Sequence, residues 1–166
     1  MAEVAIRAAE LSDAEAIASV HASAWRTAFT FLPSRFLEAM TAGAVLAKWE
    51  ADLVLPTTSM FVAISEGDVI GFLQVRADGD EGEVMSLYVD PLRWRQRVGS
   101  TLLDFGEAWL VSQGVDSAAL WTARESPQSR SFYEDRGWVA SGGEQTQVLG
   151  PANVALHEVE YRKSLA

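Results

Sequence analysis

The chain contains no cysteine among its 166 residues and only two histidines, His21 and His157. The lack of cysteine excludes disulfides, thiolate zinc sites and a cysteine nucleophile. With so few imidazoles a histidine-rich metal site is nearly excluded as well, so we expect no metal. No uninterrupted apolar run approaches the ~18–20 residues that a membrane helix needs, so we expect no membrane partner.

Positive charge is also scarce. The 13 basic residues stand against 23 acidic ones, which gives a formal net charge of −10. This balance argues against a general nucleic-acid binder, which needs a basic face, and it tilts slightly toward cationic partners. The first residues are acidic and lack the basic segment of a secretory signal. We therefore expect a soluble, cytoplasmic protein.

Apolar residues make up 49% of the chain, enough for one packed domain over 1–166. Ser12, with Glu15 three residues later, predicts the N-cap and capping box of the first helix. Apolar periodicity and turn residues predict strands at 4–7, 60–65, 69–77, 83–90, 118–123, 138–149 and 154–163, and helices at 12–28, 32–40, 44–53, 98–113 and 127–136. The predicted fold is α+β: a mixed, mostly antiparallel sheet with one parallel strand–helix–strand unit near 83–123, flanked by helices.

Three arginines, Arg93, Arg95 and Arg97, lie within five residues where a predicted strand gives way to a helix. A helix start exposes unpaired backbone N–H groups and the positive end of the helix dipole, which favour anions. Gly99 would let the backbone approach a ligand closely. The cluster therefore indicates a phosphate-bearing ligand. The alternative, solvated arginines and a glycine needed only for helix–sheet packing, stays open.

Two segments resemble the GNAT family of acyl-coenzyme A-dependent N-acetyltransferases. "LYVDPLRWRQRVGSTLL" resembles the strand–helix segment in which that family grips the coenzyme A pyrophosphate through backbone amides, and "LWTARESPQSRSFYEDRGW" resembles its next strand–helix segment. The resemblance implies a GNAT-like fold and acetyl-coenzyme A as the acyl donor. The cofactor contacts that it implies are Leu87, Val89, Arg95, Gln96, Arg97, Val98, Gly99, Ser100 and Ser126.

The two segments differ from the family pattern at three positions. Trp94 stands where the motif begins with Arg or Gln, Arg97 stands at its first glycine, and Ser126 replaces a frequent asparagine. Trp94 and Arg97 keep an alternative function open, that of a non-catalytic module that binds acyl-coenzyme A or a partner protein.

The predicted function is transfer of an acetyl group to a primary amine. Without cysteine a thiol-linked acyl-enzyme is excluded, and the resemblance implies the family's usual route, direct attack by the amine in a ternary complex. Tyr133 is the candidate acid, since its ordinary pKa of ~10 lies near that of an alkyl thiol. The family places a tyrosine there, whereas the residues alone also fit a core aromatic. Backbone N–H groups of Leu87 and Val89 are implied to hold the thioester carbonyl.

Glu83 is the candidate base that accepts the amine proton. Strict alternation puts it in phase with Met85, Leu87 and Val89 on its strand, and the family often carries a glutamate at a comparable position. The alternative is a charge at the strand end in solvent.

His21 and Trp25 share one face of the first helix because they are four residues apart. The resemblance places this region beside the acceptor site, with Trp25 as a wall and His21 as a second base, and core packing is the alternative. His157 alternates with Val159 and Tyr161 and is interpreted as structural. The acceptor amine, the length of the acyl group and a homodimer are left open.

Overall fold

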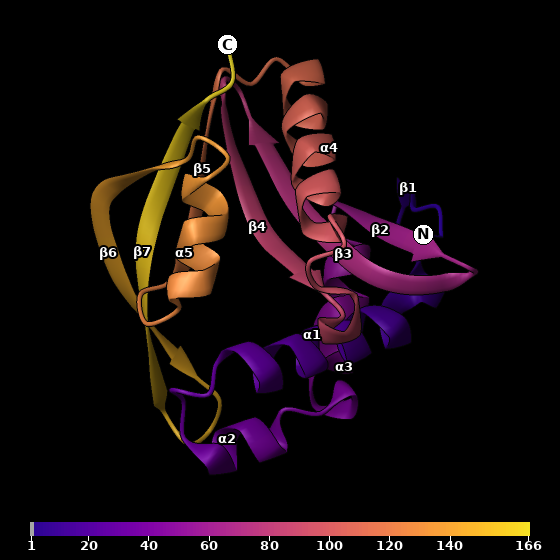
Figure 1. Cartoon of the computed structure of the whole chain (residues 1–166), viewed down its shortest axis with the longest axis vertical. Helices are drawn as coiled ribbons and strands as arrows, with labels where there is room; N and C mark the ends of the chain where they lie inside the picture. The colour runs from indigo at the N-terminus through magenta and orange to yellow at the C-terminus, as the bar shows by residue number, and fades with distance from the viewer. Residues whose placement is uncertain (1) are drawn as a thin grey trace.

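The computed structural model describes residues 2–166, whose seven strands form one mixed sheet in the order β1-β2-β3-β4-β5-β7-β6 (Figure 1). β4 and β5 run parallel, and every other neighbouring pair is antiparallel. The expected α+β architecture with one parallel unit is thus confirmed. In chain order the elements are β1 (Ala5–Ala8), η1 (Leu11–Asp13), α1 (Ala14–Ala28), α2 (Ser34–Ala39), α3 (Ala42–Leu53), β2 (Ser59–Ser65), β3 (Asp68–Asp78), β4 (Glu81–Val89), η2 (Pro91–Arg93), α4 (Val98–Ser112), β5 (Ser117–Ala123), α5 (Pro127–Glu134), β6 (Val139–Leu149) and β7 (Val154–Ser164).

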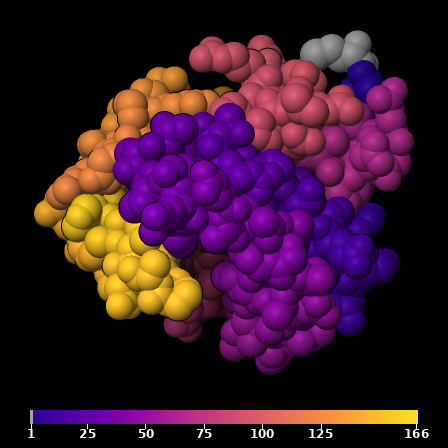
Figure 2. Space-filling model, turned by 90° about the horizontal axis from the view of Figure 1, so that it is seen from below, coloured from indigo at the N-terminus to yellow at the C-terminus, as the bar shows by residue number. Residues whose placement is uncertain are grey.

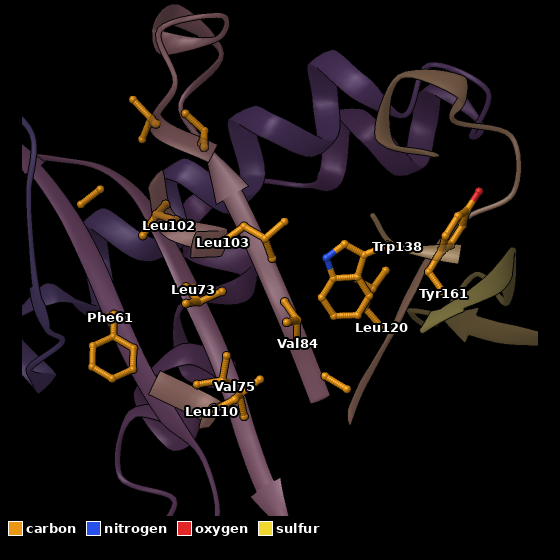
Figure 3. Close-up of a cluster of buried hydrophobic side chains, with 14 of the residues drawn as sticks. Phe61, Leu73, Val75, Val84, Leu102, Leu103, Leu110, Leu120, Trp138 and Tyr161 are labelled. Carbon is orange, nitrogen blue, oxygen red and sulfur yellow. The ribbon is translucent and has the colours of Figure 1, made fainter. Parts of the chain in front are cut away.

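Helices cover both faces of the sheet. α4 packs on β3 and β4 and α5 packs on β5, on the face that we call the α4 face. α1 and α3 pack together, and α1 lies on the opposite face, which we call the α1 face. Figure 3 shows the core of the α4 face, where Leu73 and Val84 from the sheet meet Leu102 and Leu110 from α4. Burial of each such side chain contributes about 1.5–3 kcal/mol, which holds α4 firmly in place.

β4 and β5 pair only at one end. Their register runs from Glu81 opposite Ser117 to Val84 opposite Leu120, and beyond that point the two strands have no pairing with each other. The later part of β4, which contains Leu87, therefore has backbone groups that β5 does not satisfy. This separation opens the sheet at its centre.

A bulge interrupts β4 in the same region. The register of β4 against β3 skips Met85, which is the extra residue. A bulge reverses the alternation of side chains, so Glu83 lies on the α1 face with Tyr88. The prediction that Glu83 is in phase with Leu87 and Val89 is therefore wrong. A strict two-residue period cannot reveal an inserted residue.

The first helix also begins differently from the prediction. Ser12 lies inside the 3₁₀ turn η1, and the reciprocal capping bonds join Glu10 and Asp13 instead. The Asp13 carboxylate also binds Arg7 of β1 at 2.8 Å. The expected cap at Ser12 with Glu15 is wrong because a short 3₁₀ turn precedes the α-helix.

The other predicted helix boundaries agree with the structure to within two residues. The Ser126 hydroxyl accepts a hydrogen bond from the Ser129 N–H at the start of α5, and Gly114 and Gly137 take positive φ angles of 87° and 85° after α4 and α5. Within residues 2–166 no helix has the length and apolar content to cross a membrane. That same stretch holds no group of acidic and imidazole side chains arranged to bind a metal.

Candidate active site

A cleft of about 770 Å³ opens where β4 and β5 separate. Its lining comes from the end of β4 (residues 87–89), the loop into α4 together with the first turn of that helix (93–95 and 97–100), the α5 region (127–136) and the end of α1 (24–29). Four segments far apart in the sequence thus enclose one cavity. α5 forms one wall and the start of α4 forms the other.

The loop before α4, residues 93–97, which we call the arginine loop, has an unusual backbone. Arg95 and Arg97 both have left-handed φ angles, 61° and 65°, and Arg97 is the N-cap of α4. The first N–H groups of α4 have no partner within the helix, so they are available to an anion. Arg93, Arg95 and Arg97 all line the cleft, which adds positive charge beside these donors.

Trp94 supports this loop from inside. Its indole Nε1 donates a hydrogen bond to the carbonyl oxygen of Val89 at 2.9 Å, and its ring packs against the core under α4. Arg97 takes the left-handed conformation that a glycine would adopt most easily. The two departures from the family motif therefore fit an ordered loop.

Gly99 in the first turn of α4 has room for a side chain. A Cβ built there would lie 3.4 Å from the nearest atom, in the ring of Phe132, which is an ordinary contact. Gly106, two turns later, is different, because a Cβ there would lie 2.7 Å from Leu73 Cδ2. Helix–sheet packing thus requires glycine at Gly106 and does not account for Gly99, which faces the cleft.

Tyr133 projects from α5 into the cleft. Within residues 2–166 its hydroxyl makes no hydrogen bond, so it is free to donate one. Burial raises the pKa of Tyr133 above its usual 10.0, and nearby Tyr88 acts in the same direction. The expected match to the pKa of a thiol is therefore not found in the free protein, whose hydroxyl stays protonated at neutral pH.

His21 lies in an aromatic box formed by Trp25, Trp49 and Tyr88, whose rings have centroids 5.1–5.3 Å from its own. Its Nδ1 accepts a hydrogen bond from Trp49 Nε1 at 2.9 Å. Burial lowers the pKa of His21 to about 4, and Lys48 contributes in the same direction. His21 is thus neutral with its proton on Nε2, an arrangement that favours packing over a role as a base.

Trp25 combines burial with an unused donor. It is only 7% exposed, it lines the cleft, and its Nε1 has no hydrogen-bond partner in the described part of the chain. Burial raises the pKa of Tyr88 to about 12. The Trp25 indole N–H acts to lower this pKa, although it makes no hydrogen bond of ordinary geometry to the Tyr88 hydroxyl. The indole N–H therefore lies near the Tyr88 hydroxyl but remains unsatisfied.

Glu83 does not line the cleft. Its carboxylate accepts a hydrogen bond from the guanidinium of Arg76 at 2.6 Å, at the end of the sheet where β4 and β5 are still paired. Gln96, Ser126 and His21 also lie outside the lining. The cleft brings together the remaining predicted residues, Trp25, Leu87, Val89, Arg95, Arg97, Val98, Gly99, Ser100 and Tyr133.

Two residues near the cleft were missed by sequence reasoning, Tyr88 and Glu158. Tyr88 follows Leu87 directly, and its side chain is buried on the α1 face. Glu158 lies opposite Ala123, the last residue of β5. The alternation of Leu156 and Glu158 in β7 is the signal that could have found the second, because it places a carboxylate directly after a buried leucine on the same face of the strand.

A second hollow of about 460 Å³ lies between the α1–α2 turn and the β6–β7 hairpin. Phe31 and Pro33 form one side, and Glu125 and His157 contribute polar groups. Glu125 is paired with Arg124 at 3.4 Å, so its charge is already partly balanced.

Comparisons with known proteins agree with this geometry. Residues 17–138 match the model of the acetyltransferase (GNAT) family. The uncharacterized N-acetyltransferase YuaI of Bacillus subtilis is 31% identical over 138 residues, which cover 79% of this chain and 78% of YuaI.

Solved structures share the fold. A GCN5-related N-acetyltransferase from Rhodopseudomonas palustris superposes with a TM-score of 0.81 at 24% identity, covering 99% of this chain and 97% of that protein. The PaiA N-acetyltransferase from Thermoplasma acidophilum, solved in complex with coenzyme A, gives a TM-score of 0.71 at 18% identity, covering 94% of this chain and 98% of PaiA. At such identities the likeness shows the fold alone.

Proposed function

The chain belongs to the acetyltransferase (GNAT) family and is an acyltransferase, and on this basis we propose that it moves an acetyl group from acetyl-coenzyme A to a primary amine. The observation that carries the proposal is the single cleft between β4 and β5. Its lining includes both the start of α4 with three arginines and the Tyr133 side chain.

The arginine loop fits the pyrophosphate of coenzyme A. The N–H groups of Gly99 and Ser100 lie in the first turn of α4, where the helix dipole favours negative charge. Gly99 presents no side chain to this end of the cleft, although packing leaves room for one. Guanidinium groups from the loop would add charge-assisted hydrogen bonds to phosphate oxygens.

The thioester would then lie along the unpaired end of β4, with the backbone N–H groups of Leu87 and Val89 near its carbonyl. The amine attacks the carbonyl carbon directly, the new C–N bond forms, and the C–S bond breaks. The Tyr133 hydroxyl donates a hydrogen bond to the departing sulfur and passes its proton as negative charge develops there. Its raised pKa ensures that the proton is present at the start.

The amine must also lose a proton. Glu83 remains a candidate for this role, but its carboxylate is bound to Arg76 and lies outside the cleft. It would therefore need a chain of water molecules to reach the amine.

Ligand-dependent thermal unfolding tests the donor first. A ligand at 100 times its Kd stabilises the folded state by ~2.7 kcal/mol. We expect a saturable rise in Tm with acetyl-coenzyme A and with coenzyme A, and little change with ATP. Turnover is then measured on a panel of primary amines with acetyl-, propionyl- and butyryl-coenzyme A. Binding without turnover on any amine would favour the non-catalytic alternative, and no Tm shift would contradict the proposal altogether.

A further inference from the structure

Glu158 of β7 is a carboxylate without a cation. Its only side-chain hydrogen bond within residues 2–166 comes from Gln145 Nε2 at 3.0 Å, and it takes part in none of the ion pairs there. The next glutamate on the same face, Glu160, is paired with Arg162 at 3.7 Å and accepts a hydrogen bond from Ser141 at 2.6 Å. Burial raises the pKa of Glu158, as expected for a carboxylate that loses water and gains no cation.

The sheet places Glu158 beside the cleft. It is paired across the strands with Ala123, which is buried with Trp25 and Leu156 on the α1 face. Tyr88 packs against the same cluster and also lines the cleft. Tyr88 and Glu158 thus lie on the same face beside Ala123, and besides burial the charge of Glu158 raises the pKa of Tyr88.

Glu158 and Glu83 lie on the same face of the sheet but at different positions along the strands. Glu83 is opposite Ala119 of β5 and Glu158 is opposite Ala123. Four residues along a strand correspond to roughly 13 Å. Glu158 is therefore at the end of β5 where the strands have separated, whereas Glu83 is at the end where they are paired. On this side Figure 2 shows a notch between the yellow atoms of β7 and the purple atoms of α3.

Among the described residues, the groups around Glu158 supply no cation that is free to pair with its carboxylate. Gln145 donates to it from β6, and Glu160 and Arg162 follow on its own strand. Tyr88 of β4 packs against the cluster that contains Ala123, the strand partner of Glu158. From α1, His21 is neutral at ordinary pH and the Trp25 indole N–H is unpaired. Arg162 already binds Glu81 at 2.6 Å and Glu160. A cation is the ligand that this carboxylate lacks.

We propose that Glu158 binds the ammonium group of the acceptor and takes its proton, with the Tyr88 hydroxyl as the link into the cleft. This rests on the proposed acetyl transfer. In that step the ammonium gives one proton to the Glu158 carboxylate, directly or through the Tyr88 hydroxyl, and the free amine forms the C–N bond. The thiolate released by C–S cleavage receives its proton from Tyr133. The acceptor class is a primary amine that arrives as a cation.

The test compares Glu158→Gln with Glu160→Gln and Glu83→Gln. Turnover of n-butylamine, 1,4-diaminobutane and phenethylamine is followed as kcat/KM from about pH 6 to about pH 10, approaching the pKa of the ammonium group. We expect Glu158→Gln to lose ~100-fold or more near pH 7, as for loss of a general base, and to recover as pH rises and the amine deprotonates by itself. Glu160→Gln is the control and should keep the wild-type profile, while Glu83→Gln tests the rival base and should not reproduce the loss near pH 7 that we expect for Glu158→Gln.

Two further measurements separate the outcomes. Affinity for acetyl-coenzyme A should be unchanged in Glu158→Gln, which shows that the fold and the donor site are intact. If that variant does not fold, Glu158→Asp should keep the pH profile with a lower kcat. An equal loss at every pH, or a pH-dependent loss in Glu83→Gln instead, would overturn the role of Glu158 while acetyl transfer stands. Absence of turnover in the wild type would overturn both.

Discussion

The arginine loop and the α1 face meet at one cleft. The residues of the arginine loop are consecutive in the sequence, whereas those of the α1 face are far apart in it. Leu87, the arginine loop and the first turn of α4 form one continuous stretch of fourteen residues, 87–100. The opposite side combines Tyr88 from that stretch with Trp25 on α1 and Glu158 on β7, which are far from it in the sequence. A site made from consecutive residues carries its pattern in the local sequence, whereas one made from distant residues exists only after folding.

The two sides also use different groups. The arginine loop offers backbone N–H groups and guanidinium charge, held by left-handed φ angles and by the hydrogen bond from Trp94 to Val89. The α1 face offers packed aromatic rings, a neutral histidine and an unpaired carboxylate. One side suits a phosphate-bearing donor and the other a cationic acceptor. The contrast predicts that variants on the two sides separate donor binding from acceptor chemistry.

The largest effect is expected from Tyr133→Phe, where the two sides meet. Removal of the hydroxyl should lower kcat by ~10²–10⁴-fold, the usual contribution of a positioned acid, without weakening acetyl-coenzyme A binding. Steady-state kinetics and calorimetry measure the two quantities. Tyr161→Phe is the control, because that hydroxyl donates to Glu134 at 2.6 Å and does not line the cleft. Equal kcat in Tyr133→Phe and wild type would remove the assigned role.

The next effect is on the free energy of unfolding at acid pH, and it arises from His21 on the α1 face. The pKa of His21 is about 4 in the folded protein and 6.5 ordinarily, so the unfolded chain binds the extra proton first. Stability should therefore fall as pH falls from 6.5 to 4 and level off below, by roughly 3 kcal/mol in total. Urea unfolding across this range measures the change.

Two variants test whether His21 causes that loss of stability. His21→Gln should remove it, although it should also lower stability at neutral pH by disturbing the bond from Trp49. His157→Gln should leave it intact, since His157 lies outside the aromatic box, on the exposed β6–β7 pairing with Thr146. The lowered pKa of the Asp13 carboxyl does not interfere, because its contribution is lost only below about pH 4. The same acid loss in His21→Gln would show that another group carries it.

The smallest effect sharpens the role of the arginine loop. Gly99→Ala should stabilise the free protein by up to ~1 kcal/mol, because alanine suits a helix better than glycine. The same methyl group should weaken acetyl-coenzyme A binding by ~10-fold if the backbone there approaches the pyrophosphate. Thermal unfolding with and without ligand measures both. Gly106→Ala is the matched control and should destabilise by ~1–3 kcal/mol because of Leu73. Unchanged affinity in Gly99→Ala would contradict the close approach.

Local patterns predicted most of the fold correctly. The strands expected at 60–65 and 69–77 meet at a turn in which Glu66 and Gly67 have positive φ, and the helix expected at 127–136 begins directly after its N-cap, Ser126. Both are short-range features. The predictions that were wrong failed because of a short 3₁₀ turn and a single inserted residue, neither of which the residue pattern reveals. The 3₁₀ turn before α1 moved the cap to Glu10 and Asp13, where Asp13 also binds β1.

The bulge at Met85 had a larger consequence for the site. It moved Glu83 to the face opposite the one that alternation predicts, and the register left it beside Arg76 and away from the cleft. The alternation from Ser86 to Val89 is undisturbed, so Tyr88 lies on the face opposite Leu87 as a regular strand predicts. The inserted residue therefore changed only the face on which Glu83 lies relative to Leu87 and Tyr88.

By itself the amino-acid sequence determined the elements, their order, the family and the arginine loop, because each depends on residues within a few positions of one another. The tertiary structure alone decided where β4 and β5 separate, that Trp94 and Arg97 fit an ordered loop, and which glutamate is left without a cation. These depend on strand register and on pairings such as that of Ala123 with Glu158, thirty-five residues apart. Burial and pairing are properties of the folded chain, so a carboxylate acquires its charge environment only when the strands are in place.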